Sequence, residues 1–313
     1  MKKEWVWLIA LSLCIVLVIP WSILRWQKEK VITDDVQIRI LMPSGEVVKI
    51  AMEDYLLGVV AAEMPAEFEI EALKAQAVAA RTYAAKRLGQ KNSSDIGYDV
   101  DTTVQTQAWL SDTQMKAKWG WFNYWRYRGR LQKAVSETRS QVLVANGEYI
   151  DAFYHSSSGR KPTERSEEVW SSPRPYLQNV SSGEENLQRY IKSFSFTPTE
   201  LYKKLGIKGS PKAIDSEDIQ VLSRTTVGRV KSVRLLGKVY LATQLRSLLG
   251  LPSTDIEWVV QPERLIITAY GNGHAVGMSQ WGANDLAKKN KKVEEILAHY
   301  YPGTKLMALG YKR

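Results

Sequence analysis

Hydrophobic and polar positions divide the chain into short β segments and amphipathic helices. Residues 36–42 alternate between apolar and polar side chains, and residues 46–50 do so again after a turn, which predicts a β-hairpin. Apolar residues at helical spacing then predict one helix from Met52 and a second, alanine-rich helix between Pro65 and Gly89. The chain therefore opens with a hairpin followed by two helices.

The pattern beyond Gly89 alternates between β and helical character. Strands are predicted at 141–145, 148–154, 219–224, 230–235, 239–241, 258–260 and 265–270. Helices are predicted at 242–249 and from about 281 and 293, whereas 168–170 and 175–180 have extended or turn character. The pattern of residues 184–216 predicts helices that are interrupted by Pro and Gly. Such a segment is typical of a separate lobe or an insertion. We expect an α+β fold, mixed helical and antiparallel β, with a second lobe.

One acid interrupts the first helical pattern. The apolar stripe of that helix consists of Met52, Tyr55, Leu56, Val59 and Val60. Glu63 falls on the same stripe, at the carbonyl end of the helix, and Pro65 ends the helix so that the side chain can face a cleft. The helix dipole and partial burial both raise the pKa of a carboxyl group there, as a general acid at neutral pH requires. Glu63 is therefore the candidate catalytic acid; the alternative is a surface glutamate at a frayed helix end.

Composition narrows the class of protein. The 313 residues are 44% hydrophobic, enough for one large core or two smaller ones. The formal net charge of +10 predicts an anionic partner: nucleic acid, an acidic membrane face or an anionic polymer of the cell envelope.

The N-terminus has the pattern of a membrane anchor. Residues 5–24 form an uncharged apolar run close to the ~20 residues that span a bilayer, with tryptophans near both ends. No small-residue cleavage site follows it. We predict a cytoplasmic tail at 1–4, an uncleaved signal-anchor at 5–24, a linker at 25–34 and an extracytoplasmic body at 35–313, attached to the cell membrane by a single pass.

Cysteine and histidine are scarce. The only cysteine, Cys14, lies inside the predicted anchor, and the three histidines are His155, His274 and His299. The chain therefore offers no disulfide framework, no thiolate site and no zinc motif, and we expect neither a metal nor another cofactor.

Two polar loops and an aromatic cluster are further candidates. The loop 155–159 follows a predicted strand, and the glycine-rich loop 271–283 would let a polymer chain approach the backbone, with Gln280 donating hydrogen bonds. Residues 109–127 combine many aromatic side chains with lysine and arginine. Such a cluster suits sugars, nucleic-acid bases or a membrane surface, or it is a helix whose aromatic face packs on the domain.

Several of these segments together resemble the stage II sporulation protein D family. The resemblance rests on residues 63–65 with 71–83, 153–159, 169–170, 175–177 and 273–283, in the family's order from about residue 35 onward. It implies a lytic transglycosylase that cleaves peptidoglycan glycan strands during sporulation engulfment. It also implies a preference for strands whose stem peptides have been removed by stage II sporulation protein P, and assembly with stage II sporulation protein M. Zinc ligands found in some relatives have no counterpart here, because the predicted body has no cysteine.

The resemblance places the catalytic carboxyl on Glu63 as well. It implies that Glu63 first protonates the bond between N-acetylmuramic acid and N-acetylglucosamine and then takes the proton of the 6-hydroxyl group, leaving a 1,6-anhydro end without a second acid. The candidate substrate-binding residues are Lys74, Gln76, Arg81, Tyr83, His155, Ser156, Ser157, Tyr176, His274, Ser279 and Gln280. Two alternatives stay open: a non-catalytic glycan-binding enhancer of a cell-wall amidase, and a membrane-tethered nucleic-acid binder, which rests on charge and aromatics alone. We expect no nucleic-acid partner.

Overall fold

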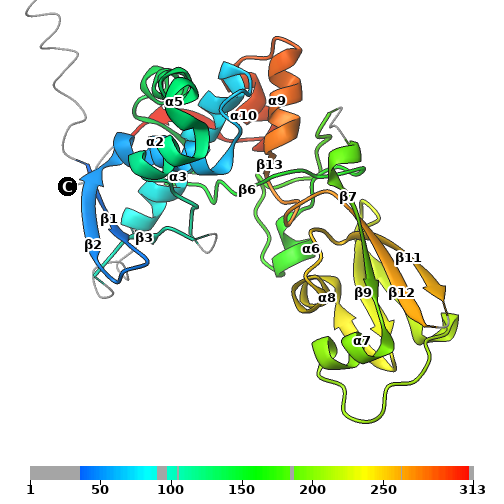
Figure 1. Ribbon diagram of the computed structural model, residues 1–313. Helices are drawn as coiled ribbons and strands as arrows, with labels where there is room; N and C mark the ends of the chain where they lie inside the picture. Colours follow the sequence, from blue (N-terminus) through cyan, green and yellow to red (C-terminus); the bar gives the residue numbers. More distant parts are fainter. Residues whose placement is uncertain (1–35, 90–96, 104–105, 184–186, 262, 310–313) are drawn as a thin grey trace, which may run out of the picture.

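The computed structural model describes residues 36–89, 97–103, 106–183, 187–261 and 263–309, and these form two lobes (Figure 1). Each lobe has its own hydrophobic core. The larger lobe combines the chain before residue 184 with the chain after residue 270, and the smaller lobe is the segment between them. The smaller lobe is therefore inserted into the sequence of the larger one.

The predicted membrane anchor is outside this description. Residues 1–4, 5–24 and 25–34 all precede the first described residue. Among the helices from residue 36 onward that the structure describes, none combines the length and the apolar character needed to cross a bilayer.

The larger lobe is organised around two consecutive helices. Its helices are α2 (Met52–Glu63), α3 (Ile70–Leu88), α5 (Asp112–Glu137), α6 (Ser166–Trp170), α9 (Gln280–Lys288) and α10 (Val293–Tyr300). Its strands are β1 (Gln37–Leu41), β2 (Val47–Ala51), β3 (Val100–Asp101), β4 (Gln141–Ala145), β5 (Glu148–Tyr149), β6 (Tyr154–His155), β13 (Met278–Ser279) and β14 (Lys305–Ala308). Because most of its buried residues are alanines, α3 approaches its neighbours closely and contacts α2, α5, α9, α10 and β4.

Three small sheets border this core. They have the strand orders β2-β1-β3, β14-β4-β5 and β13-β6. The pairs β1–β2, β4–β5 and β4–β14 are antiparallel, whereas β1–β3 and β6–β13 are short parallel pairs. Asn146 and Gly147, both with positive φ, form the predicted turn between β4 and β5.

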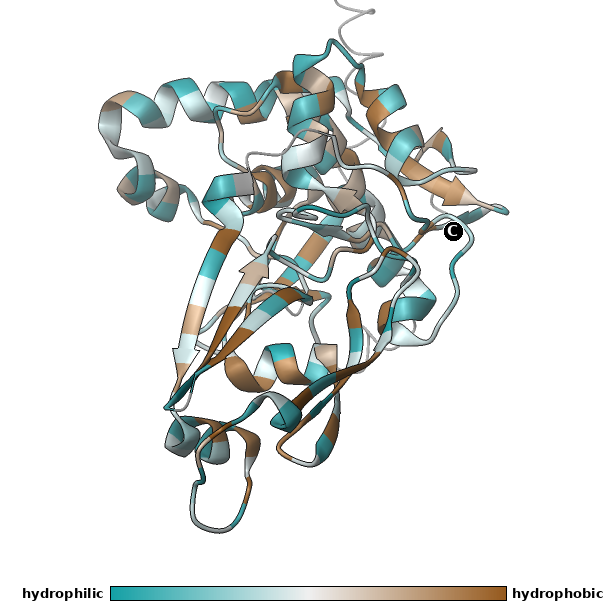
Figure 2. Ribbon diagram, turned by 90° about the vertical axis from the view of Figure 1, so that its right-hand side faces the viewer, coloured by the Kyte–Doolittle hydropathy of each residue, from teal (hydrophilic) through white to brown (hydrophobic). Residues whose placement is uncertain are grey.

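The smaller lobe consists of two antiparallel sheets covered by short helices. Its elements are η1 (Leu187–Tyr190), β7 (Ile191–Phe196), α7 (Pro198–Leu205), η2 (Ser216–Asp218), β8 (Ile219–Arg224), β9 (Val230–Leu235), β10 (Lys238–Leu241), α8 (Ala242–Leu249), β11 (Asp255–Gln261) and β12 (Arg264–Tyr270). The strand orders are β10-β9-β8 and β11-β12-β7. Hydropathy along these strands alternates in Figure 2, as expected for sheets that bury one face.

Most of the predicted elements are confirmed, and three are wrong. The first hairpin, both helices around Pro65, and the strands and helix between 219 and 270 form as predicted. Residues 168–170 belong to helix α6, and 191–196 form strand β7 rather than helix. The strand predicted at 148–154 ends at Tyr149, because Tyr154 leaves its hairpin to pair with β13. These errors concern short segments whose partners are distant in sequence, where tertiary pairing overrides local pattern.

Gly58 determines how closely the chain before α5 approaches α2. The backbone N–H of Leu110 donates to the carbonyl of Gly58 at 3.1 Å. A Cβ atom at position 58 would lie 2.6 Å from the Leu110 carbonyl and would collide with the Trp109 ring. Glycine therefore allows the 106–111 segment to lie directly on α2, near its C-terminal end.

We expect Gly58→Ala to destabilise the protein by ~1–3 kcal/mol, because the added methyl group overpacks this contact. Thermal unfolding of the purified variant measures the effect. The matched control is Gly129→Ala in α5, where a Cβ atom meets nothing within 4 Å and helix propensity predicts no loss. Equal melting temperatures for the two variants would contradict the role given to Gly58.

Candidate active site

A pocket of about 390 Å³ opens in the larger lobe beside the end of α2. Its described lining residues are Glu63, Tyr83, Thr106, Gln107, Ala152, Phe153, Tyr154, His155, Ser156, Trp170, Asn272, Gly273 and His274. They come from the C-terminal end of α2, from α3, from the segment before α5, from β6 and its flanks, from α6 and from the glycine-rich loop. Glu63 is the only acid among these lining residues.

The carboxylate of Glu63 is held by two donors from distant parts of the chain. The backbone N–H of Ala108 donates to Oε1 at 3.1 Å, and Nε2 of Gln280 donates to Oε2 at 3.3 Å. The same Gln280 amide reaches Oε1 of the buried Gln76 at 3.4 Å. Helices α2, α3 and α9 thus meet at one carboxyl group.

Burial raises the pKa of Glu63 above its usual range, and the hydrogen bonds from Gln280 and Ala108 oppose that rise. Glu63 is the last residue of α2, and the last turn of the helix contains no basic side chain. The carboxyl group therefore lies where desolvation and the helix dipole both favour its protonated form. A group in this environment can donate a proton and then hold the resulting charge against two donors.

Neutral polar side chains line the pocket next to Glu63. Nε2 of Gln107 donates to the hydroxyl of Tyr154 at 3.0 Å, while its Oε1 accepts from the hydroxyl of Tyr55 at 3.0 Å. Burial raises the pKa of Tyr154 well above its usual range, and Glu63 adds to the effect. Tyr154 therefore stays a neutral phenol beside the carboxyl group.

His155 is held in place by the protein itself. Nδ1 lies 3.2 Å from the carbonyl of Val276 and Nε2 lies 2.8 Å from the hydroxyl of Ser158, which in turn accepts from Ser182. Burial lowers the pKa of His155 well below its usual range. Since the ring is neutral and the Val276 carbonyl can only accept, Nδ1 carries the proton and Nε2 accepts from Ser158. His155 forms part of the wall, with both ring nitrogens already bonded.

An aromatic group closes one side of the pocket. The ring of His274 lies 5.0 Å from that of Trp170 and 5.6 Å from that of His155, and Trp170 lies 4.8 Å from Phe153. Burial lowers the pKa of His274 to about 4, and Arg246 contributes. Trp170 keeps 42% of its surface exposed, so that part of this side chain is accessible to a ligand.

The glycine-rich loop serves the protein's own packing. A Cβ atom on Gly273 would lie 2.6 Å from Cβ of His155, and one on Gly277 would collide with the carbonyl of Phe153. Both residues have positive φ, a conformation that side-chain-bearing residues rarely adopt. These glycines let the loop lie against β6. Gln280 donates a hydrogen bond to Glu63 within the protein, and the approach of a polymer chain to this loop stays a prediction.

Seven of the predicted binding residues lie outside the pocket lining. Gln76 and Gln280 are bonded at the Glu63 carboxylate, whereas the other five have separate partners: Lys74, Arg81, Ser157, Tyr176 and Ser279. Lys74 is paired with Glu71 and Glu137. Arg81 is fully buried, where it binds Glu53 and the carbonyls of Val135 and Gln141. Both cations therefore link secondary-structure elements of the protein. For Arg81 this is expected, because a buried arginine needs carboxylate and carbonyl partners.

The other three polar groups also bond within the protein. The hydroxyl of Tyr176 bonds to Asp151. The hydroxyl of Ser157 accepts from the N–H of Gly159, and that of Ser279 caps α9. A position in a polar loop or turn could not by itself distinguish these structural roles from binding.

The remaining predicted residues are brought together. Tyr83, His155, Ser156 and His274 line the pocket with Glu63, and Gln76 and Gln280 stand directly behind the carboxylate. Residue patterns did not single out Thr106, Gln107, Trp170 or Asn272 as site residues, although all four line the pocket. They lie in loops or a short helix, where no periodic signal exists.

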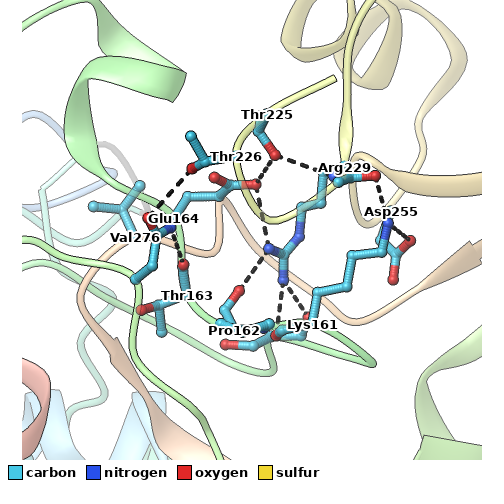
Figure 3. A network of polar contacts seen from close by, with 12 residues as sticks. Lys161, Pro162, Thr163, Glu164, Thr225, Thr226, Arg229, Asp255 and Val276 are labelled. Atoms are coloured by element: carbon cyan, nitrogen blue, oxygen red, sulfur yellow. Dashed lines mark hydrogen bonds and ion pairs between the residues drawn. The ribbon is translucent and has the colours of Figure 1, made fainter. Parts of the chain in front are cut away.

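A buried ion pair joins the two lobes next to the pocket (Figure 3). Arg229, at the start of β9, is fully buried and reaches Glu164 at 3.3 Å. Its guanidinium also donates to the carbonyls of Ser158, Lys161 and Pro162. The smaller lobe thereby holds the loop that follows β6. His155, at the end of β6, and Ser156, directly after it, are lining residues of the pocket.

Comparison with known proteins identifies relatives of this chain. The family model described as "SpoIID: Stage II sporulation protein" matches residues 44–144. Stage II sporulation protein D of Bacillus subtilis (strain 168) is 36% identical over 262 residues, covering 82% of this chain and 74% of the relative. The protein of the same name from Bacillus amyloliquefaciens is 37% identical over 259 residues, covering 81% and 73%. The amidase enhancer of Bacillus subtilis (strain 168) is 30% identical over 303 residues, covering 80% of this chain and 40% of that protein.

We expect Glu63→Gln to increase the stability of the protein relative to the wild type, and to do so more at neutral pH than at acidic pH. Because the folded state raises the pKa of Glu63 above its ordinary value of 4.5, the folded protein binds the proton more tightly than the unfolded chain. Stability is therefore lost as pH rises from the unfolded pKa through the folded one, by about 1.4 kcal/mol per pKa unit of difference. Glutamine keeps the shape without this loss.

Thermal unfolding of both proteins at about pH 4 and about pH 7 measures the difference. The melting temperature of the variant minus that of the wild type is expected to increase between the two conditions. The control is Glu46→Gln, which makes the same chemical change at an exposed turn. A difference that shrinks towards neutral pH for Glu63→Gln would contradict the raised pKa.

Proposed function

This chain belongs to the stage II sporulation protein D family, and we propose that it is a lytic transglycosylase that cleaves peptidoglycan glycan strands with Glu63 as its acid and base. The observation that carries the proposal is a single desolvated carboxyl group, held by two donors, in a pocket whose described lining contains no second acid.

The proposed reaction needs one carboxyl group twice. Protonated Glu63 donates to the glycosidic oxygen between N-acetylmuramic acid and N-acetylglucosamine, and the bond from that oxygen to the anomeric carbon breaks. The 6-hydroxyl oxygen of the same muramic sugar attacks the anomeric carbon, and its proton passes to the Glu63 carboxylate. The products are a free N-acetylglucosamine hydroxyl and a 1,6-anhydro ring, and no water is consumed.

The surroundings of Glu63 support this use of one acid. Hydrolases of glycosidic bonds ordinarily require two carboxyl groups on opposite sides of the bond. An internal nucleophile removes that requirement, since the attacking hydroxyl belongs to the substrate. The donors Ala108 and Gln280 stabilise the carboxylate after the first proton transfer, while burial raises the pKa of Glu63 and so favours the protonated form before it.

Recognition of the sugar is assigned to the open side of the pocket. Trp170 offers a partly exposed aromatic side chain, and Asn272, Tyr83 and Thr106 offer polar groups around it. Sugars stack their apolar C–H faces on such rings and hydrogen-bond through their hydroxyl and acetamide groups. The formal net charge of +10 agrees with a strand whose lactyl carboxylates are exposed after its peptides are removed.

The proposed setting follows the predicted anchor. A single membrane pass at 5–24 would hold the catalytic region outside the cell membrane, next to its polymer, during engulfment. Stage II sporulation proteins P and M are the proposed partners, the first because it supplies peptide-free strands.

A second candidate function rests on one comparison. The amidase enhancer of Bacillus subtilis is 30% identical to this chain. In that alternative the same pocket would bind glycan and present it to an amidase, and Glu63 would act only as a ligand.

Glu63→Gln is expected to lower cleavage of purified peptide-free glycan strands by ~10²–10⁴-fold, because the amide can neither donate a proton to the leaving oxygen nor accept one. Mass spectrometry of the products detects the 1,6-anhydro ends. Glu46→Gln, an exposed acid-to-amide change, is the matched control and should retain full activity.

Undiminished anhydro products from Glu63→Gln would exclude Glu63 as the acid. If the wild type forms no anhydro ends but increases product release by an added amidase, the enhancer function replaces the transglycosylase.

Trp170→Ala is expected to raise KM for the glycan roughly 10-fold with a smaller change in kcat. A stacked ring contributes ~0.5–1.5 kcal/mol beyond its buried area, and 1.4 kcal/mol is tenfold in binding. Steady-state kinetics on strands of fixed length separates the two constants. Trp170→Phe should recover most of the loss, and a fall in kcat alone would assign Trp170 to the chemistry instead.

A further inference from the structure

Helix α5 consists of two arms joined at a glycine. Gly120 interrupts the helix with φ 71° and ψ 166°, values outside the helical region. The arms before and after it project sideways from the larger lobe in Figure 2. The residues directly after Gly120 therefore lie at a protruding tip rather than in a continuous rod.

One face of α5 accounts for its attachment to the lobe. Met115, Tyr124, Tyr127 and Leu131 are buried, and Trp119 packs edge-on against Tyr127 with ring centroids 5.5 Å apart. Polar contacts complete the attachment. Lys118 donates to the carbonyl of Ala61 at 3.1 Å, and Arg130 donates to the carbonyls of Ala66 and Phe68.

Folding does not explain the aromatic side chains at the tip. Trp121, Phe122 and Trp125 expose 66%, 91% and 56% of their surfaces. Trp121 and Trp125 are one turn apart and meet edge-on at 5.9 Å, so together with Phe122 they form a convex group, here called the aromatic tip. A contiguous apolar surface of this kind marks a site of interaction.

The charged side chains nearest the aromatic tip along α5 are all basic, while Glu67, from the segment before α3, lies close to Tyr127 and Arg126. Between Asp112 and Glu137, α5 contains no acid, and its bases are Lys116, Lys118, Arg126, Arg128, Arg130 and Lys133. Lys116 and Arg128 are paired with Asp112 at the base of the first arm, and Lys133 is paired with Glu137 at the end of the second. Arg126, exposed beside the tip, stacks over the ring of Tyr127 at 4.7 Å.

We propose that the aromatic tip of α5 inserts into the interface of an anionic lipid bilayer. Tryptophan and phenylalanine rings enter the boundary between headgroups and acyl chains, and flanking lysine and arginine side chains attract the anionic headgroups. The tip is a membrane contact in addition to the predicted anchor at 5–24, and it would orient the larger lobe rather than merely tether it.

The geometry favours a bilayer over a glycan strand at this position. The three aromatic residues are absent from the pocket lining. Their rings protrude, with Trp121 and Trp125 at 86° to each other, instead of forming one flat platform. Stacking on a sugar needs a flat or concave aromatic surface, whereas a convex wedge suits insertion between lipids.

The test places a fluorescent probe at the tip of the full chain. The native Cys14 is replaced by serine, and an environment-sensitive fluorophore is attached to the variant Phe122→Cys. The protein is incorporated into vesicles of phosphatidylethanolamine and phosphatidylglycerol containing a lipid with a nitroxide quencher near the headgroup. We expect a blue shift and quenching several-fold stronger than in vesicles of phosphatidylcholine alone.

The matched control is the same label on Val239→Cys, a residue that is 60% exposed on β10 of the smaller lobe. Adding Trp121→Ser and Trp125→Ser to the Phe122→Cys protein should reduce the quenching towards the control, with unchanged circular dichroism. Equal quenching at positions 122 and 239, or no difference between the lipids, overturns the proposal. A probe at 122 that responds to peptide-free glycan strands and not to lipid would assign the tip to glycan binding instead.

Discussion

The desolvated carboxyl group of Glu63 is the constraint on which the rest of the larger lobe depends. Its two donors come from Ala108 and Gln280, which lie 45 and 217 residues away in sequence. Burial favours the protonated form, and the two hydrogen bonds favour the ionised form. An acid that must donate and then accept a proton needs both influences, so the approach of these two distant segments to α2 is part of its chemistry.

The close backbone approaches around the pocket follow from that requirement. Gly58 lets the 106–111 segment lie on α2 and deliver the Ala108 N–H, and Gly273 lets the glycine-rich loop lie on His155. The neutral His155 and Tyr154 add no charge beside the carboxyl group. The lobe thus places Glu63, the one acid of the described pocket lining, among groups that bond to it or to one another.

The smaller lobe stabilises this arrangement from outside. Arg229 binds Glu164 and three carbonyls of the loop after β6. Because its guanidinium is buried, leaving that charge without partners would cost folding free energy. Arg160 forms a second link, to Asp255 and Glu257 on β11. An insertion with its own core can therefore act on the pocket by holding one loop, without contributing a lining residue.

Local pattern determined the hairpin, the two helices around Pro65, most strands of the smaller lobe and the anomalous position of Glu63, because periodicity and helix-end signals act over a few residues. It could not distinguish Arg81, a buried ion-pair partner, from Gln76, which stands behind the carboxylate, since both are polar residues of the same alanine-rich helix. It also missed Trp170 and Gln107, which reach the pocket from non-periodic segments. Tertiary structure alone decided the partners of Glu63, because hydrogen bonds across 45 and 217 residues depend on packing that no local segment encodes.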